Sequence, residues 1–94
     1  MRNKSKTVND LKAGFTKSPE VRNLHTIAYE IGTNWDNVYF GAEPYLAAMF
    51  SLTTMDDMYG VEGAKEIVTR FLGQAQTWRG ETARRVKAEL KSML

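Results

Sequence analysis

Apolar residues recur at every third or fourth position along four stretches of the chain, and this spacing predicts four helices. The predicted helices cover residues 19–32, 43–53, 61–76 and 78–93. Start signals support the first and the last, because a proline follows a serine at Ser18-Pro19 and Thr77 can cap a helix that begins at Trp78. No stretch alternates between apolar and polar residues, so no sheet is predicted. The pattern therefore predicts an all-α fold, a compact bundle of about four short helices.

The N-terminal residues lack this periodicity. Residues 1–17 are polar and basic, which predicts a partly disordered basic arm, and residues 18–94 are predicted to form a single helical domain. A length of 94 residues fits one domain and implies a small core. Large apolar side chains are expected to form most of that core, namely Trp35, Tyr45, Leu46, Phe50, Val68, Phe71, Trp78 and Leu90. Alanine in place of Phe50 is expected to cost about 3–5 kcal/mol.

The composition leaves few residues for catalysis or metal binding. The chain has no cysteine and a single histidine, His25, which excludes a thiolate zinc site and a cysteine nucleophile. No pattern brings His25 to a hydroxyl nucleophile, so we interpret it as a boundary residue of the first helix. The acidic cluster at residues 56–66 lacks the spacing of a calcium loop, and Asp56 and Asp57 are expected to precede or cap the third helix. We therefore predict no metal, no cofactor and no enzymatic activity.

The chain also lacks the apolar segments that direct proteins to membranes. No apolar run approaches the ~18–20 residues that a membrane-spanning helix needs. The first ten residues contain no apolar stretch of the kind found in a signal peptide. The expectation is a cytoplasmic protein without membrane association.

Charge is distributed unevenly along the chain, although the net charge is only +2. Residues 1–22 and 70–94 each carry six basic and two acidic residues, whereas residues 23–69 carry one basic residue and seven acidic ones. Such asymmetry bears on partners and solubility rather than on fold. Either the basic ends fold back over the acidic middle, or the charged segments contact partners.

Two candidate binding surfaces follow from this distribution. The acidic, aromatic-rich middle combines large anchor side chains with a charged rim, as protein interfaces do. Its candidate protein-binding residues are Trp35, Asp36, Tyr39, Met55, Asp56, Asp57, Met58 and Tyr59. The C-terminal part carries basic residues suited to nucleic acid or an acidic surface, namely Arg70, Arg79, Arg84, Arg85, Lys87 and Lys91. A solvated helix face explains these basic residues equally well.

Two segments of the chain stand out for their particular residues rather than for periodicity. They read NWDNVYFGAEPYLAAM at residues 34–49, and TWRGE at residues 77–81 followed by KAELKSML at residues 87–94. In these segments, and over residues 24–94 as a whole, the chain resembles small proteins encoded by tailed bacteriophages. The resemblance implies an accessory factor that binds and inhibits or redirects a host protein in the cytoplasm of an infected bacterium. It carries over no catalytic residue.

Three kinds of function remain open at this point. The first expectation is a small non-enzymatic accessory protein that binds a host or phage protein, with defence and nucleic-acid-handling factors among the candidates. One alternative is a small nucleic-acid-binding helical module that uses the basic C-terminal helix, and another is a self-assembling structural phage protein. A homodimer is compatible with each of these, because a core this small gains from burying more apolar surface.

Overall fold

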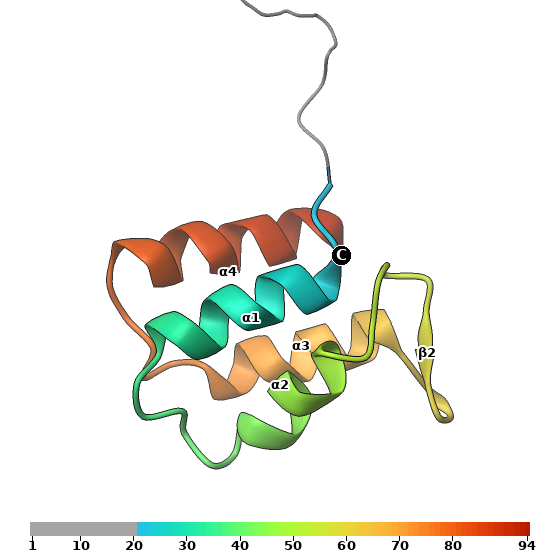
Figure 1. The fold of residues 1–94 in the computed structure, drawn as a ribbon, viewed down its shortest axis with the longest axis horizontal. Coiled ribbons are helices and arrows are strands. Elements are labelled where there is room, and N and C mark those ends of the chain that lie inside the picture. The colour runs from blue at the N-terminus through green and yellow to red at the C-terminus, as the bar shows by residue number, and fades with distance from the viewer. Residues whose placement is uncertain (1–20) are drawn as a thin grey trace, which may run out of the picture.

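The computed structural model describes residues 21–94, which form four helices and one two-stranded antiparallel hairpin (Figure 1). The elements follow one another as α1 (Leu24–Asn34), α2 (Glu43–Met49), β2 (Met58–Tyr59), β3 (Glu62–Gly63), α3 (Ala64–Gln74) and α4 (Glu81–Met93). The prediction of a helical bundle with four helices is confirmed, apart from the small hairpin. The predicted basic arm, residues 1–17, and the predicted helix start at Ser18-Pro19 lie outside the described residues.

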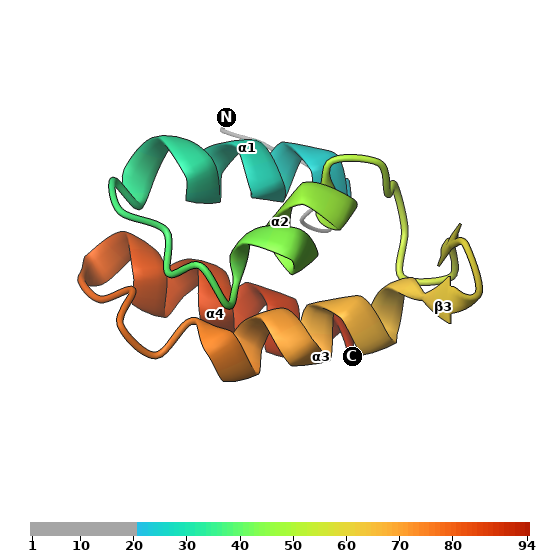
Figure 2. The ribbon, with the colours of Figure 1, turned by 90° about the horizontal axis from the view of Figure 1, so that it is seen from below.

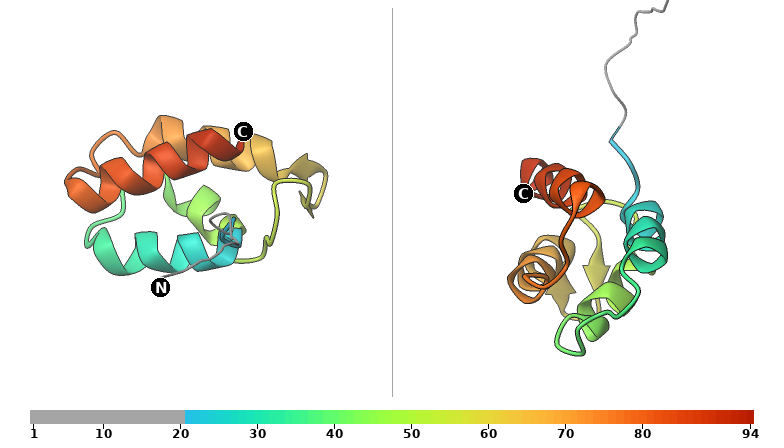
Figure 3. Two further views of the ribbon diagram at one scale, coloured as in Figure 1. Left: turned by 90° about the horizontal axis from the view of Figure 1, so that it is seen from above. Right: turned by 90° about the vertical axis from the view of Figure 1, so that its left-hand side faces the viewer.

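The four helices surround a common core (Figures 1 and 3). α1 and α4 lie side by side and run in opposite directions, and α3 runs opposite to α4 (Figures 1 and 2). The short α2 contacts both α1 and α3, so it covers the side of the core that the three longer helices leave uncovered. Each helix therefore buries one face, as the spacing of apolar residues predicted.

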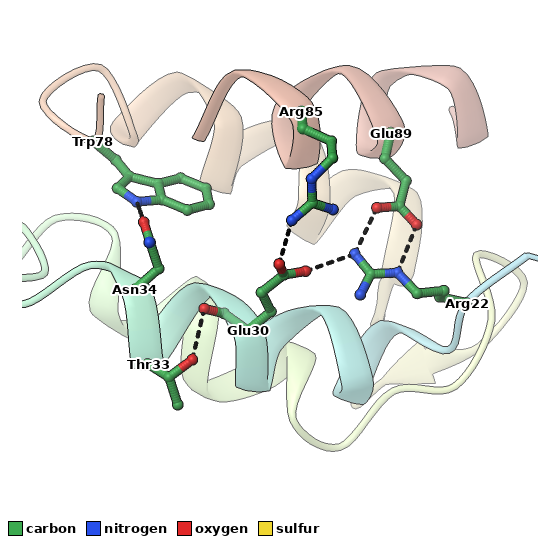
Figure 4. Close-up of polar contacts among 7 residues, drawn as sticks. All are labelled: Arg22, Glu30, Thr33, Asn34, Trp78, Arg85 and Glu89. Atoms are coloured by element: carbon green, nitrogen blue, oxygen red, sulfur yellow. Dashed lines mark hydrogen bonds and ion pairs between the residues drawn. The ribbon is translucent and has the colours of Figure 1, made fainter. Parts of the chain in front are cut away.

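Two tryptophans that lie just outside the helices occupy the core at one end of the bundle. Trp35 follows α1 and Trp78 precedes α4, and their rings stack with centroids 5.7 Å apart and planes 14° from parallel. Phe71 of α3 meets Trp35 edge-on, with ring centroids 6.3 Å apart. The indole Nε1 of Trp78 donates a 2.9 Å hydrogen bond to Oδ1 of Asn34, so its polar atom is satisfied although the residue is buried (Figure 4). This cluster ties α1, α3 and α4 together.

Most of the predicted core is confirmed. The confirmed residues, all at most 6% exposed, are Trp35, Leu46, Val68, Phe71, Trp78 and Leu90. Tyr45 is only partly buried, and the prediction for Phe50 is wrong, because its side chain is 47% exposed. The helix predicted over residues 43–53 ends at Met49, and the chain then turns so that Leu52 enters the core instead of Phe50. The large cost expected for Phe50→Ala therefore loses the burial on which it rested.

The start of the last helix differs from the prediction for a steric reason, whereas its end at Met93 agrees with it. α4 begins at Glu81 rather than at Trp78, and Thr77 does not cap it. The residue before the helix is Gly80, with φ +112° and ψ −179°, a conformation that is open essentially to glycine alone. This extended turn lets the Trp78 ring point into the core while α4 starts in a different direction. The first helix likewise begins at Leu24, five residues after the predicted start at residue 19.

The hairpin contradicts the prediction that the chain contains no sheet. β2 pairs with β3 in antiparallel register, with Met58 opposite Gly63 and Tyr59 opposite Glu62. The two-residue turn places Gly60 at its first position with φ +62°, where primed hairpin turns favour glycine. Strands of two residues are too short to show alternation, and the hairpin takes up residues 61–63, which the pattern assigned to the third helix.

Candidate interaction surfaces

The hairpin exposes three large apolar side chains, two on β2 and one in the turn, which we call the hairpin surface. Met58 is 61% exposed, Tyr59 47% and Val61 94%. The hairpin projects beyond the helices at the start of α3 (Figures 1 and 2). Exposed apolar groups that cluster on a projecting element are typical of contact sites for other molecules.

Asp57 fixes the loop from which the hairpin rises. Its Oδ2 accepts hydrogen bonds from the backbone N–H groups of Thr53 at 2.7 Å and Thr54 at 3.1 Å, and its Oδ1 accepts one from the Thr54 hydroxyl at 3.2 Å. The carbonyl of Asp57 accepts the N–H of Ala64 at 2.9 Å, which closes the base of the hairpin. The carboxylate therefore organises its own loop. Asp57 precedes the third helix, as one of the two expectations had it, but does not cap it, because Gly63 occupies that position.

The same hydrogen bonds make the stability of the protein depend on pH. The N–H groups of Thr53 and Thr54 stabilise the carboxylate of Asp57 and lower its pKa below the ordinary value. A carboxyl group whose pKa is lower in the folded state stabilises the fold above its unfolded pKa of about 4, and that stabilisation is lost as the pH falls through the folded pKa. We expect the thermal unfolding midpoint to fall on acidification below about pH 4, and to fall less steeply in Asp57→Asn.

Asp56→Asn is the matched control for this prediction. Asp56 is exposed, and its only described hydrogen bond runs from its backbone N–H to the Thr54 hydroxyl at 3.2 Å. The variant should therefore keep the acid dependence of the wild type in a series of thermal melts. Equal acid dependence in Asp57→Asn and the wild type would contradict the assigned role of Asp57.

The structure divides the predicted protein-binding residues between two ends of the molecule. Trp35 is buried in the core and cannot serve as a surface anchor, so its assignment to the surface is wrong. Asp36 and Tyr39 are exposed on the loop that follows α1, at the opposite end from the hairpin (Figure 1). Met55 is half-buried and packs against the core. Asp56, Asp57, Met58 and Tyr59 remain together at the hairpin.

Val61 belongs to the hairpin surface but was not predicted there. Its apolar side chain fitted the helical spacing of the segment that follows it, so the pattern assigned it to a helix face. The signal that distinguishes the two assignments is Gly60, because a glycine at the start of a two-residue turn favours a hairpin.

Ion pairs between α1 and α4 account for part of the basic residues (Figure 4). Arg22 binds Glu89 through two hydrogen bonds, at 2.9 Å from Nε and 2.6 Å from Nη2. Glu30 accepts a hydrogen bond from Arg85, and Nη2 of Arg22 forms an ion pair with it at 2.9 Å. Arg85 first, and then Arg22, lower the pKa of Glu30. The network joins the start of α1 to α4.

The predicted basic residues fall into two groups according to their partners. Arg70 pairs with Glu62 and Glu66, and Arg85 pairs with Glu30. The remaining basic residues have no carboxylate within 4 Å in the part of the chain that the structure describes, and we call them the basic flank: Arg79, Arg84, Lys87 and Lys91.

Lys87 is held at the centre of the basic flank by the residues around it. Its Nζ donates a 2.7 Å hydrogen bond to the carbonyl of Trp78 and lies 5.9 Å from the centroid of the Trp78 ring. Burial lowers the pKa of Lys87, and the positive charges of Lys91 and Arg79 lower it further. The charge of Lys87 is therefore close enough to those of Lys91 and Arg79 to be repelled by both.

Two hollows of the described surface do not gather groups suited to catalysis. One lies between the start of α1, residues 53–55 and the end of α4, and Met55 and Met93 contribute to its apolar lining. The other lies between Tyr39 and the end of α3, where Gln74 lines it. His25 is exposed and lines neither hollow. Residues 21–94 contain no group of three His, Asp or Glu side chains arranged to hold a metal ion.

Comparison with known proteins adds no further assignment. No protein-family model matches this chain, and neither a curated protein nor a solved structure matches it. Among the described residues, no helix has the length and apolar character needed to cross a membrane. The resemblance to phage proteins stays a prediction that rests on the residues quoted for it, and the function has to be argued from the surfaces themselves.

Proposed function

We propose that this protein is a non-enzymatic binding protein that docks onto another protein through its hairpin surface. The observation on which the proposal rests is the exposure of Met58, Tyr59 and Val61 on one projecting hairpin. Each square ångström of apolar surface removed from water contributes roughly 25 cal/mol, so covering these side chains is favourable. Tyrosine and methionine are also enriched in protein interfaces.

The charges near the hairpin indicate what the partner should look like. Asp56 is exposed beside β2, and its carboxylate has no cation within 4 Å in the described chain. Glu66 of α3 is 59% exposed at its side chain and lies 3.8 Å from Arg70, at the limit of an ion pair. A partner with an apolar pocket and a basic rim would complement this surface. The resemblance to phage accessory proteins supports a bacterial host protein as that partner.

Affinity capture with matched variants tests the proposal. The tagged full chain is incubated with nuclease-treated bacterial lysate, in parallel with the triple variant Met58→Ser, Tyr59→Ser, Val61→Ser. The control is Tyr29→Ser with Phe40→Ser, which removes exposed apolar side chains (66% and 75% exposed) from other elements. One protein should be retained by the wild type and the control and lost by the triple variant.

The retained protein is then purified and titrated by calorimetry. The triple variant should bind at least ~30-fold more weakly than the wild type, since an interface anchor contributes about 2 kcal/mol or more. Equal binding by the triple variant and the wild type would contradict the proposal. Size-exclusion chromatography provides a second readout. If the wild type elutes as a dimer and the triple variant as a monomer, the hairpin surface joins two copies of this chain.

A further inference from the structure

The charged residues on one side of α4 form ion pairs with other residues, whereas those on the other side form none within residues 21–94. On the side that faces α1, Arg85 and Glu89 take part in the ion-pair network with Glu30 and Arg22 (Figure 4). On the other side, Arg84, Lys87 and Lys91 follow one another at spacings of three and four residues, which places them on one helix face. The basic flank therefore concentrates cations that have no carboxylate of residues 21–94 within 4 Å.

Like charges at this spacing destabilise a helix, and an external anion would relieve the repulsion. Burial lowers the pKa of Lys87, and the nearby charges of Lys91 and Arg79 lower it further, as repulsion among these cations would. The hydrogen bond from Lys87 to the Trp78 carbonyl holds one of the cations in place, which reduces the entropy that binding would cost.

We propose that the basic flank binds the phosphate backbone of a nucleic acid without reading its sequence. Phosphate contacts need only cations and account for most sequence-independent binding. From Arg84 to Lys91 the helix rises about 10 Å, which matches about three phosphates of one strand. This surface is independent of the hairpin surface, since the two lie on different elements (Figure 1).

An acidic protein is the less suitable partner for this flank. Protein interfaces depend on a few large anchors that become fully buried. Trp78 is already 2% exposed, and the exposed uncharged residue beside this face, Ala88, is small. α4 also contains no Asn, Gln or aromatic residue that would bind an adenine or stack on a base, so neither adenine readout nor base stacking is expected there.

Fluorescence anisotropy with a labelled 20-base-pair duplex of mixed sequence tests the inference. The full chain is titrated at a series of KCl concentrations from about 50 to 200 mM, and the logarithm of the association constant is plotted against that of the salt concentration. Neutralising two flank cations, in Arg84→Gln with Lys91→Gln, should make the slope shallower by about 1.8, because each phosphate contact contributes about 0.9.

The matched control removes the same charge from cations that already have partners, in Arg70→Gln with Arg85→Gln. Its slope should equal that of the wild type, and so should the slope of the hairpin triple variant, which separates this inference from the proposed function. Circular dichroism checks that each variant stays helical. No binding of the duplex at 50 mM KCl, or equal slopes in the two double variants, would overturn the inference. So would displacement of the duplex by polyglutamate at equal charge, which would point to an acidic protein.

Discussion

Replacing Trp78 with alanine is expected to lower the free energy of unfolding by about 3–5 kcal/mol, which would unfold much of a domain with marginal stability. Trp78 is 2% exposed, stacks on Trp35 at 5.7 Å and donates a hydrogen bond to Asn34 at 2.9 Å. The substitution removes the apolar transfer energy, leaves a cavity between α1 and α4, and exposes one face of the Trp35 ring. Urea denaturation followed by far-ultraviolet circular dichroism measures the change.

Phe50→Ala is the control for this prediction. Phe50 is an aromatic residue at the end of α2 that is 47% exposed, so its truncation should cost less than about 1 kcal/mol. The two variants remove comparable side chains from positions that differ mainly in burial. If Trp78→Ala lowers the free energy of unfolding by less than about 1 kcal/mol, or if both variants lower it by similar amounts, the tryptophan cluster does not stabilise the core as proposed.

Two glycine-to-alanine substitutions are expected to change stability in opposite directions. Gly80→Ala should cost about 1–3 kcal/mol, because φ +112° with ψ −179° strains any residue with a Cβ. Space is not the reason, since nothing lies within 4 Å of the Cβ that would be added. Gly73→Ala should instead stabilise the protein by roughly 0.5–1 kcal/mol, because Gly73 lies within α3 with nothing in the way of a Cβ.

Thermal and urea unfolding of both glycine variants provide the test. The pair controls for composition, because each variant adds one methyl group at an exposed position. Destabilisation by both substitutions to the same extent would mean that the turn at Gly80 can adopt another conformation. In that case α4 could begin earlier, as its apolar pattern suggested.

The helices and most of the core could be predicted from the sequence, because both depend on the spacing and size of apolar residues that are close together in the chain. Ile27, Ala28 and Ile31 are spaced as one face of α1, and all three are buried. The two tryptophans were predicted in the core on size alone, since a small domain has few larger apolar groups to bury. The candidate cations could likewise be named from the sequence, but their partners could not.

The tertiary structure decided the features that depend on residues far apart in the chain. Arg22 and Glu89 are separated by 67 positions, and Glu30 and Arg85 by 55, so nothing in the sequence indicates that these cations are paired. The exposure of Phe50 and Val61 depends on where α2 ends and where the hairpin turns. Those points are set by the packing of neighbouring elements and by the backbone at Gly60 and Gly80. Apolar spacing determines which face of a helix is buried, whereas contacts between elements determine which surface remains for a partner.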